Sequence, residues 1–214
     1  MSLTGIPERD FDILLDLDSA SLINACQVSN YVNAICHDEY FWRQKVERDF
    51  GADVAQLKPV EETFRYQWNR LLKLNRTNPQ VAARGYPDEL TVLEKSGYVP
   101  GQDDVYYATR EGHLPVLQWL AQRGLLPNEE AVDQAFINGH VRVLDWLESR
   151  GYQFNLDSNA ANNAAWYCQI EVLNWLERRG ILPTKSGANA AYQYCTPETL
   201  DWLAARGIFP DEED

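Results

Sequence analysis

Apolar, alanine and glycine positions recur with a period of about 27 residues through the second half of the chain. The glycines lie 27, 27, 29 and 27 residues apart, at Gly97, Gly124, Gly151, Gly180 and Gly207. Each is preceded by leucines seven and four residues earlier, and each of the last four by a tryptophan five residues earlier and an alanine sixteen residues earlier. Self-similarity at a fixed period is the signature of a repeat protein.

One unit of this repeat predicts two helices joined by a tight turn. The apolar side chains of residues 114–120 form one broad helical face. Arg123 falls in the last turn, where a cation complements the helix dipole, and Gly124 suits the left-handed residue that ends a helix. The recurrent alanine indicates a shorter first helix packed closely against a partner, with Gly112-His113 as the turn between the two helices.

Stacked helix pairs bury each other's apolar faces, so the pattern predicts an all-α fold containing an α-solenoid of helix-turn-helix repeats. A partial unit covers residues 88–100, and four full units continue to about residue 210. The pattern GH-L-x-V-L-x-W-L-x-x-R-G resembles the ankyrin-type repeat, in the shortened form of about 27 residues common in giant DNA viruses of amoebae. Cys168-Gln169 and Cys195-Thr196 replace Gly-His in the last two units. The resemblance implies a protein-binding surface.

Some positions of the first helices vary while the repeat frame stays constant, and in a solenoid they align along the concave face. These are the expected target-binding residues: Tyr106, Tyr107, Arg110, Asp133, Gln134, Ile137, Asn162, Asn163, Trp166, Asn189 and Gln193. Trp166 and Ile137 are large apolar side chains at otherwise polar positions, which is typical of a binding hot spot. A plain solvated face is the alternative interpretation.

The first fifty residues predict four short helices with separate start signals. Pro7 suits the first position of a helix. Asp18 or Ser19, then Ser29, then Asp38 suit the N-caps of the next three helices. So short a segment buries only a small core, which predicts exposed apolar surface.

This head resembles an F-box, whose opening Leu-Pro appears here as Ile6-Pro7 and whose closing aromatic appears as Phe41-Trp42. An F-box ahead of ankyrin repeats is a recurrent giant-virus architecture. The resemblance implies docking onto the Skp-type adaptor of an SCF ubiquitin ligase. By that resemblance the adaptor contacts are Ile6, Pro7, Phe11, Leu14, Leu17, Leu22 and Trp42.

Between the head at residues 1–50 and the repeat domain at 79–214, residues 51–78 predict a connecting helical neck. Its helix starts at Pro59, carries acidic side chains early and basic side chains late, and stops before Pro79. We interpret the basic side chains as dipole complementation and solvation, with a binding patch as the alternative.

Charge narrows the classes of partner. Lys and Arg number 19 against 32 Asp and Glu, so the net charge is -13. Such a field repels phosphate backbones and disfavours a nucleic-acid partner. No apolar run approaches the length of a membrane span, and MSLTGIPERD lacks the features of a signal peptide. We therefore expect a cytoplasmic protein without a membrane partner, acting in the host cytoplasm if it is viral.

Catalytic and metal-binding constellations are not found in the sequence. The four cysteines form no CxxC pair, so reduced thiols are expected. Cys168 and Cys195 share a repeat position, and equivalent Cα atoms of neighbouring repeats lie about 10 Å apart, too far for a disulfide. His113 and His140 also share a position and are expected to bond the turn backbone. We expect no cofactor, no metal and no enzymatic activity.

The leading functional hypothesis is a protein-protein interaction adaptor that recruits an unknown target protein to an SCF-type ubiquitin ligase through its repeats. Joining two binding modules raises the effective concentration of the target near the ligase. The alternative is a scaffold without ligase function, in which the F-box-like head only caps the solenoid, since terminal repeats need a covered outer face.

Overall fold

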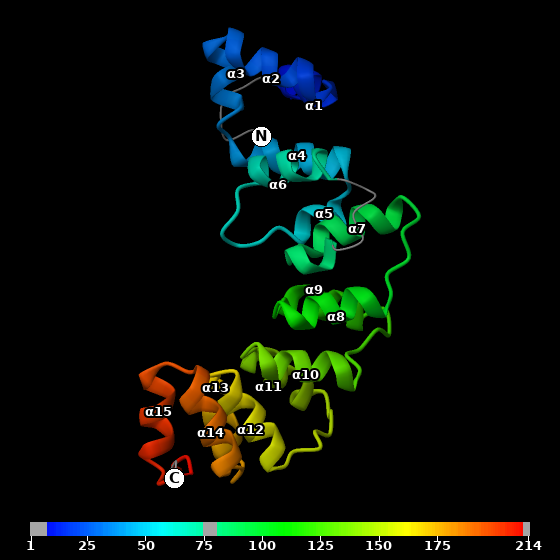
Figure 1. Cartoon of the computed structure of the whole chain (residues 1–214). Coiled ribbons are helices and arrows are strands. Elements are labelled where there is room, and N and C mark those ends of the chain that lie inside the picture. The colour runs from blue at the N-terminus through cyan, green and yellow to red at the C-terminus, as the bar shows by residue number, and fades with distance from the viewer. Residues whose placement is uncertain (1–7, 75–80, 212–214) are drawn as a thin grey trace. The chain divides into compact units, whose positions relative to one another are not determined.

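The computed structural model describes residues 8–74 and 81–211, and within them the chain is all-helical (Figure 1). These residues form fifteen α-helices and one 3-10 helix, with no strand among them. The helices fall into two compact units. The first comprises the described residues before 75 together with Tyr86–Val99, and the second comprises residues 81–85 together with the described residues from Pro100 onward. The expected all-α class is confirmed.

The helices of the first unit begin largely where the sequence predicts. They are α1 (Glu8–Asp16), α2 (Ser19–Val28), α3 (Asn30–Ile35), α4 (Glu39–Asp49), α5 (Ala52–Gln56), α6 (Phe64–Leu72) and α7 (Pro87–Lys95). The side chains of Asp18, Ser29 and Asp38 accept hydrogen bonds from the backbone N–H groups of α2, α3 and α4, which confirms them as N-caps. The neck helix α6 starts at Phe64 rather than Pro59, because Thr63 is its cap.

Aromatic side chains form the core of the first unit. The rings of Phe11 and Phe41 meet edge to face at a centroid distance of 5.2 Å, and those of Trp42 and Trp68 lie 5.0 Å apart. Leu22 and other apolar side chains of α1 to α6 complete this core. Apolar surface also stays exposed on the head, at Ile13, Ile23, Val28, Tyr31 and Tyr40. The expected exposed apolar surface is therefore confirmed.

A buried lysine joins α4 to the end of α1. The ammonium of Lys45 donates to the carbonyl oxygens of Leu15 at 2.7 Å and Leu17 at 2.8 Å, and it pairs with Asp49 at 3.0 Å. The last carbonyls of a helix have no partner within the helix, so Lys45 satisfies groups that would otherwise be costly to bury.

A buried arginine joins α6 to α7. Arg70 bonds Asp88 at 2.8 Å, Glu89 at 2.9 Å and Glu62 at 3.1 Å, and its guanidinium lies 3.7 Å from the ring centroid of Tyr86. Burial opposes the charge, but the hydrogen bonds and charge of Asp88, followed by Glu89 and Glu62, raise the pKa of Arg70 above its ordinary value. The interpretation of the neck's basic side chains as solvated is therefore wrong for Arg70, which is only 8% exposed.

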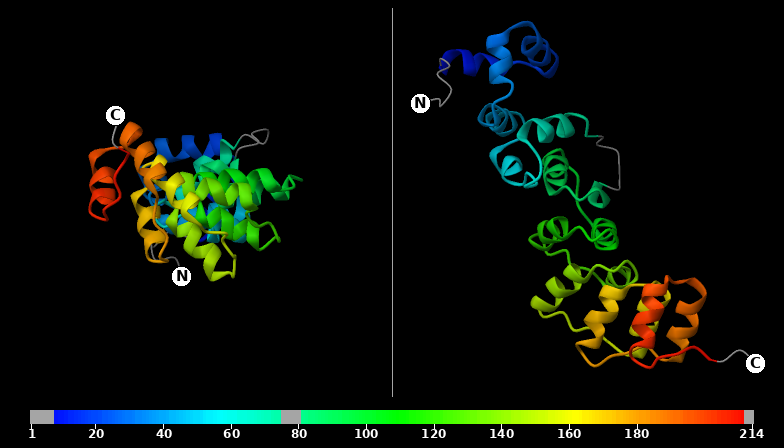
Figure 2. Two further views of the ribbon diagram at one scale, coloured as in Figure 1. Left: turned by 60° about the horizontal axis from the view of Figure 1, so that its bottom comes forward. Right: turned by 90° about the vertical axis from the view of Figure 1, so that its left-hand side faces the viewer.

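The second unit consists of successive helix pairs (Figure 2). Its elements are η1 (Val81–Arg84), α8 (Gln102–Arg110), α9 (Leu114–Ala121), α10 (Glu129–Ile137), α11 (Val141–Ser149), α12 (Ser158–Trp166), α13 (Ile170–Glu177), α14 (Lys185–Tyr194) and α15 (Pro197–Ala204). We call α8, α10, α12 and α14 the first helices, and α9, α11, α13 and α15 the second helices. Successive first helices pack against one another. The first helices are not shorter than the second helices, contrary to the prediction, because alanine limits the width of the contact and not the length of the helix.

The expected partial repeat at 88–100 groups with the head and neck instead of with the other repeats. Its helix α7 packs against α5 and supplies the Asp88 and Glu89 carboxylates that bind Arg70. The sequence periodicity includes α7 because Leu90 and Leu93 keep the repeat spacing. Asp88 and Glu89 are buried carboxylates, whereas the positions equivalent to Glu89 in the other repeats hold valine or threonine.

The second helices end as predicted, in left-handed glycines. Gly124 has φ 78°, and the N–H of Leu125 donates to the carbonyl of Leu120, five residues earlier. The arginine before the glycine does more than complement the dipole, since it stacks on the tryptophan four residues earlier. The guanidinium carbon lies 3.4 to 3.7 Å from the ring centroid for Arg123 on Trp119, Arg179 on Trp175 and Arg206 on Trp202. Among the described helices, none has the length and apolar character that a bilayer span needs.

Candidate functional site

The turns between first and second helices form a ladder along the second unit. The Nε2–H of His113 donates to the carbonyl of Ala83, and that of His140 donates to the carbonyl of Arg110, at 2.9 and 2.7 Å. Each imidazole also lies against the turn glycine of the preceding repeat, so that a Cβ on Gly112 would be 2.5 Å from His140. These hydrogen bonds confirm the prediction that both histidines bond the turn backbone.

The last step of this ladder is covalent. Cys168 and Cys195 form a disulfide with their Cα atoms 5.4 Å apart, so the prediction of reduced and distant thiols is wrong. The two residues are not structurally equivalent, which explains the error. Cys168 keeps the left-handed turn, at φ 58°, whereas Cys195 is extended and its Sγ reaches the carbonyl of Ala165, as the histidines reach back in earlier turns.

A second disulfide lies in the head. Cys26 and Cys36 are joined across the junction of α2 and α3, with their Cα atoms 5.9 Å apart. Every cysteine of the chain is therefore paired. Both halves of this pair are buried, and their spacing of ten residues matches no metal or redox motif. The sequence therefore carried no signal for the bond.

The expected target-binding residues all lie on the first helices, but two of them have internal roles. The side-chain oxygen of Asn162 accepts from the N–H of Thr184 at 2.8 Å, and that of Asn189 accepts from the N–H of Asp211 at 2.7 Å. Both asparagines occupy the same repeat position and bind the loop that follows the next second helix. We therefore assign Asn162 and Asn189 to the frame of the repeat, not to its binding surface.

The same repeat position holds Asp133 in α10, where the following loop is two residues longer. The extra residues fall between Gly151 and Ala164, which are thirteen residues apart, whereas the glycine and alanine of the other units are eleven apart. The longer loop is 152–157, from Tyr152 to the N-cap of α12. A cavity of about 350 Å³, which we call the loop cavity, lies between α10, this loop and α12.

The loop cavity combines carboxylates with aromatic rings. Its lining includes Glu129, Asp133, Phe136, Ile137, Tyr152, Phe154 and Asn163. Partial desolvation of the largely exposed Asp133 carboxyl, followed by the charge of Glu129, raises its pKa. Burial, followed by the charges of Glu129 and then Asp133, raises the pKa of the Tyr152 hydroxyl. Of the predicted target-binding residues, the structure thus brings together Asp133, Ile137 and Asn163.

The two aromatic rings of the longer loop pack into the repeat. Phe154 lies edge to face with Phe136 and with Trp175, at centroid distances of 5.8 and 5.4 Å, and 5.0 Å from Tyr152. Tyr152 and Phe154 were not predicted as site residues. The available signal was the 29-residue spacing together with Phe154 at the position where the neighbouring loops have proline.

An exposed pair of aromatic rings lies at the C-terminal ends of α12 and α14. Trp166 is 52% exposed, and its ring stacks on Tyr194 at a centroid distance of 5.9 Å. Tyr167 and Tyr192 are exposed nearby in sequence. Gln193, a predicted target-binding residue, is exposed between Tyr192 and Tyr194.

The remaining predicted target-binding residues are less distinctive. Tyr106 and Tyr107 meet edge to face at 5.6 Å and are half-buried. Arg110 pairs with Glu111 at 2.7 Å, which raises the pKa of the guanidinium. The half-buried Gln134 lies beside Asp133 on α10. These four residues are not part of the lining of the loop cavity.

The predicted adaptor contacts of the head are largely internal. Phe11, Leu14, Leu22 and Trp42 are buried in the core of the first unit, so their side chains expose little surface in this structure. The reason is that the head uses its regularly spaced apolar side chains to build its own core. Leu17 is half-buried against that core, and Ile6 and Pro7 lie outside the described residues.

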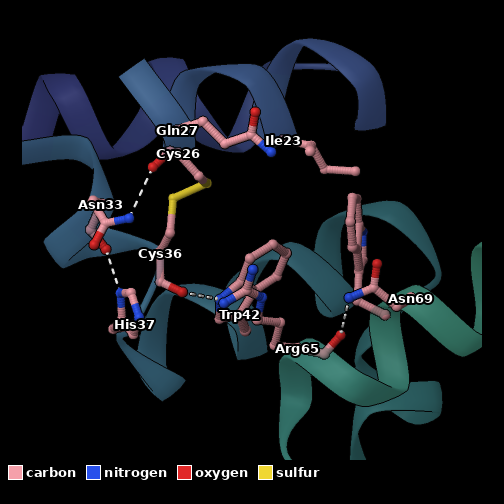
Figure 3. Close-up of a pocket in the computed structure, with 10 residues that line it drawn as sticks. Ile23, Cys26, Gln27, Asn33, Cys36, His37, Trp42, Arg65 and Asn69 are labelled. Carbon is pink, nitrogen blue, oxygen red and sulfur yellow. Dashed lines mark hydrogen bonds between the residues drawn. A yellow bond between two sulfur atoms is a disulfide. The ribbon is translucent and has the colours of Figure 1, made fainter. Parts of the chain in front are cut away.

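The surface that the head does offer includes a cavity of about 320 Å³ (Figure 3). The Cys26–Cys36 disulfide, the indole of Trp42 and the 44%-exposed Ile23 line it. Trp42 is held in place because its Nε1–H donates to the carbonyl of Cys36 at 2.8 Å. The guanidinium of Arg65 lies 5.6 Å from the ring centroid of Trp42.

No cluster of three or more potential metal ligands occurs among residues 8–74 and 81–211. Comparison with protein-family models, with curated proteins and with solved structures finds no match to this chain.

Proposed function

We propose that this chain is a non-enzymatic adaptor, in which ankyrin-like repeats in an α-solenoid bind a target protein and an F-box-like head binds the Skp-type adaptor of an SCF ubiquitin ligase. The observation that carries the proposal is that the repeats keep the same buried positions but differ in their exposed side chains. The first helices share their alanine positions, yet they present unlike surfaces, from the loop cavity at Asp133 to the exposed Trp166. A constant frame with variable surface positions favours recognition of another protein.

The burial of the head's core changes which of its side chains could dock. Exposed apolar side chains on α1 and α2, Ile13 and Ile23, are the contacts that we propose for the adaptor. Val60 is a matched control, since it is equally apolar, belongs to the same unit and is 92% exposed, but lies outside the head helices.

Co-elution of the full chain with a eukaryotic Skp-type adaptor on a sizing column tests the proposal. We expect a shared peak that is lost on Ile13→Asp with Ile23→Asp and kept on Val60→Asp. A folded chain that never co-elutes, or a peak that survives the double substitution, would overturn the head's proposed role. The proposed place of action is the cytoplasm, where thiols are kept reduced, so the assay is run with and without reductant.

A scaffold without ligase function is the second candidate, with the first unit acting as a cap. The observation that favours it is that α7, a helix with the repeat spacing, belongs to the first unit and is bound there by Arg70. Hydrogen exchange of the Arg70→Ala full chain tests it. A cap predicts lost protection in α8 and α9 as well as in the first unit, whereas an independent head predicts loss in the first unit alone.

A further inference from the structure

We propose that the loop cavity binds a basic side chain, lysine or arginine, from an exposed segment of the partner protein. This inference rests on the proposed role of the repeats in protein binding, and it specifies the chemistry of one contact. It follows from the charges of the cavity, from its aromatic walls and from the way in which the longer loop borders it.

The charges of the cavity are of one sign. Glu129 and Asp133 lie one helical turn apart on α10, and no lysine or arginine lines the cavity. The described side chains offer Asp133 no ion pair or side-chain hydrogen bond, although the equivalent Asn162 and Asn189 are both bonded. A cation placed between the two carboxylates would relieve their mutual repulsion and receive charge-assisted hydrogen bonds.

The aromatic walls suit the rest of a basic side chain. Tyr152 and Phe154 come from the longer loop and Phe136 comes from α10. Their rings can cover the aliphatic stem of lysine or arginine, and their faces attract a cation. The chain already uses this chemistry internally, because arginines stack on Trp119, Trp175 and others.

The longer loop forms one wall of this cavity. In the next two repeats an asparagine at the position of Asp133 binds the following loop. In α10 the longer loop 152–157 leaves that position unbonded, and an aspartate replaces the asparagine. The position that holds a loop-binding asparagine in the next two repeats therefore holds an exposed aspartate in α10.

Charge complementarity favours a basic segment over other occupants. The net charge of -13 repels acidic segments at long range and draws basic ones. A metal ion is a poorer match, because the cavity supplies two carboxylates where protein sites usually supply three or four ligands.

The test is a titration of the full chain with the capped tripeptide Gly-Arg-Gly, followed by amide chemical shifts. The lysine analogue is the second arm, and Gly-citrulline-Gly, which keeps the shape of arginine without its charge, is the control probe. We expect shifts of the amides in 152–157 and α10 with arginine or lysine, and none with citrulline. Equal shifts with citrulline, or shifts confined to other helices, would overturn the proposal.

Matched variants make the test specific. Asp133→Asn with Glu129→Gln should weaken binding about tenfold or more, since each charged hydrogen bond contributes strongly. Glu130→Gln together with Glu171→Gln removes the same charge at exposed positions outside the cavity lining and should leave binding within about twofold. Similar losses in both pairs would mean that only the net charge matters, and the proposal would fail.

The outcome is separable from the function of the head. Co-elution with the Skp-type adaptor is measured in parallel for the unsubstituted chain and for the chain that carries both Asp133→Asn and Glu129→Gln. If co-elution persists while arginine and lysine probes fail to bind the unsubstituted chain, the cavity proposal alone fails. If co-elution fails while the probes bind in 152–157, the ligase role fails and the cavity proposal stands.

Discussion

The two units are stabilised in different ways. The first unit depends on contacts that occur once, such as Arg70 with Asp88 and Glu89, or Lys45 with the end of α1. The second unit repeats a small set of contacts, so that a tryptophan, its stacked arginine and a terminal glycine recur in unit after unit. A single substitution should therefore cost more folding stability at these contacts of the first unit than at one of the recurring contacts of the second unit.

The largest expected effect comes from the buried arginine. Arg70→Ala should lower the free energy of unfolding by about 3–5 kcal/mol, because it leaves Asp88 and Glu89 buried without their cation. Urea unfolding of the full chain, monitored by hydrogen exchange in each unit, measures it. Arg65→Ala, on the exposed face of the same helix, is the control and should cost less than about 1 kcal/mol. A loss below that value for Arg70→Ala would contradict the comparison.

The Cys168–Cys195 disulfide is a contact of the second unit that does not recur in its other described repeats. For its sequence separation of 27 residues, loop closure predicts a contribution of about 3.5 kcal/mol. Replacing both cysteines by alanine should lower stability by that amount under oxidising conditions and change it little in excess reductant. An equal loss in both conditions would show that packing, rather than the covalent bond, is responsible.

Substitution of two glycines with similar backbone conformation compares the stability cost of a change in a turn between helices with that of a change at a helix end. Gly112→Ala should cost about 2 kcal/mol, since the left-handed residue is strained and the new Cβ displaces His140. Gly124→Ala should cost about 1 kcal/mol, because its φ is similar but its Cβ would meet open space. Thermal unfolding of both variants measures the difference. Equal costs would show that the contact between Gly112 and the His140 imidazole does not affect stability.

The smallest effect concerns Asp133. Its raised pKa means that the folded chain holds the proton more tightly than the unfolded chain, so the carboxyl favours folding below its ordinary pKa and opposes folding as pH rises above it. Asp133→Asn should therefore stabilise the chain slightly at pH 7, by less than about 1 kcal/mol because the group is exposed, and not at pH 3. Denaturation at both pH values checks the sign, and destabilisation at pH 7 would contradict it.

The sequence was most informative where positions recur. Five glycines and their leucines predicted the helix ends, and Asp18, Ser29 and Asp38 predicted helix starts through purely local hydrogen bonds. The burial of Arg70 could not be predicted, because its partners Asp88 and Glu89 lie 18 and 19 residues away, in a segment whose sequence follows the repeat pattern. Periodicity also misled at Cys195, where equal sequence spacing concealed unequal backbone conformation.

Only part of the loop cavity could be predicted from the recurring positions of the sequence. Asp133, Ile137 and Asn163 were selected because they vary within a constant frame, and they do line one cavity. Tyr152 and Phe154 belong to an inserted loop, for which the frame offers no equivalent position. The position of such residues depends on tertiary packing against Phe136 and Trp175, which no periodic argument contains.

The Cys168–Cys195 bond has a consequence for how the chain frays. Where each unit contacts only its neighbours, opening begins at a free end and proceeds inward one unit at a time. The bond ties the turn after α12 to the turn after α14. The last two helix pairs should consequently open as a single cooperative block, which makes the smallest step of terminal unfolding larger and rarer in the oxidised chain than in the reduced one.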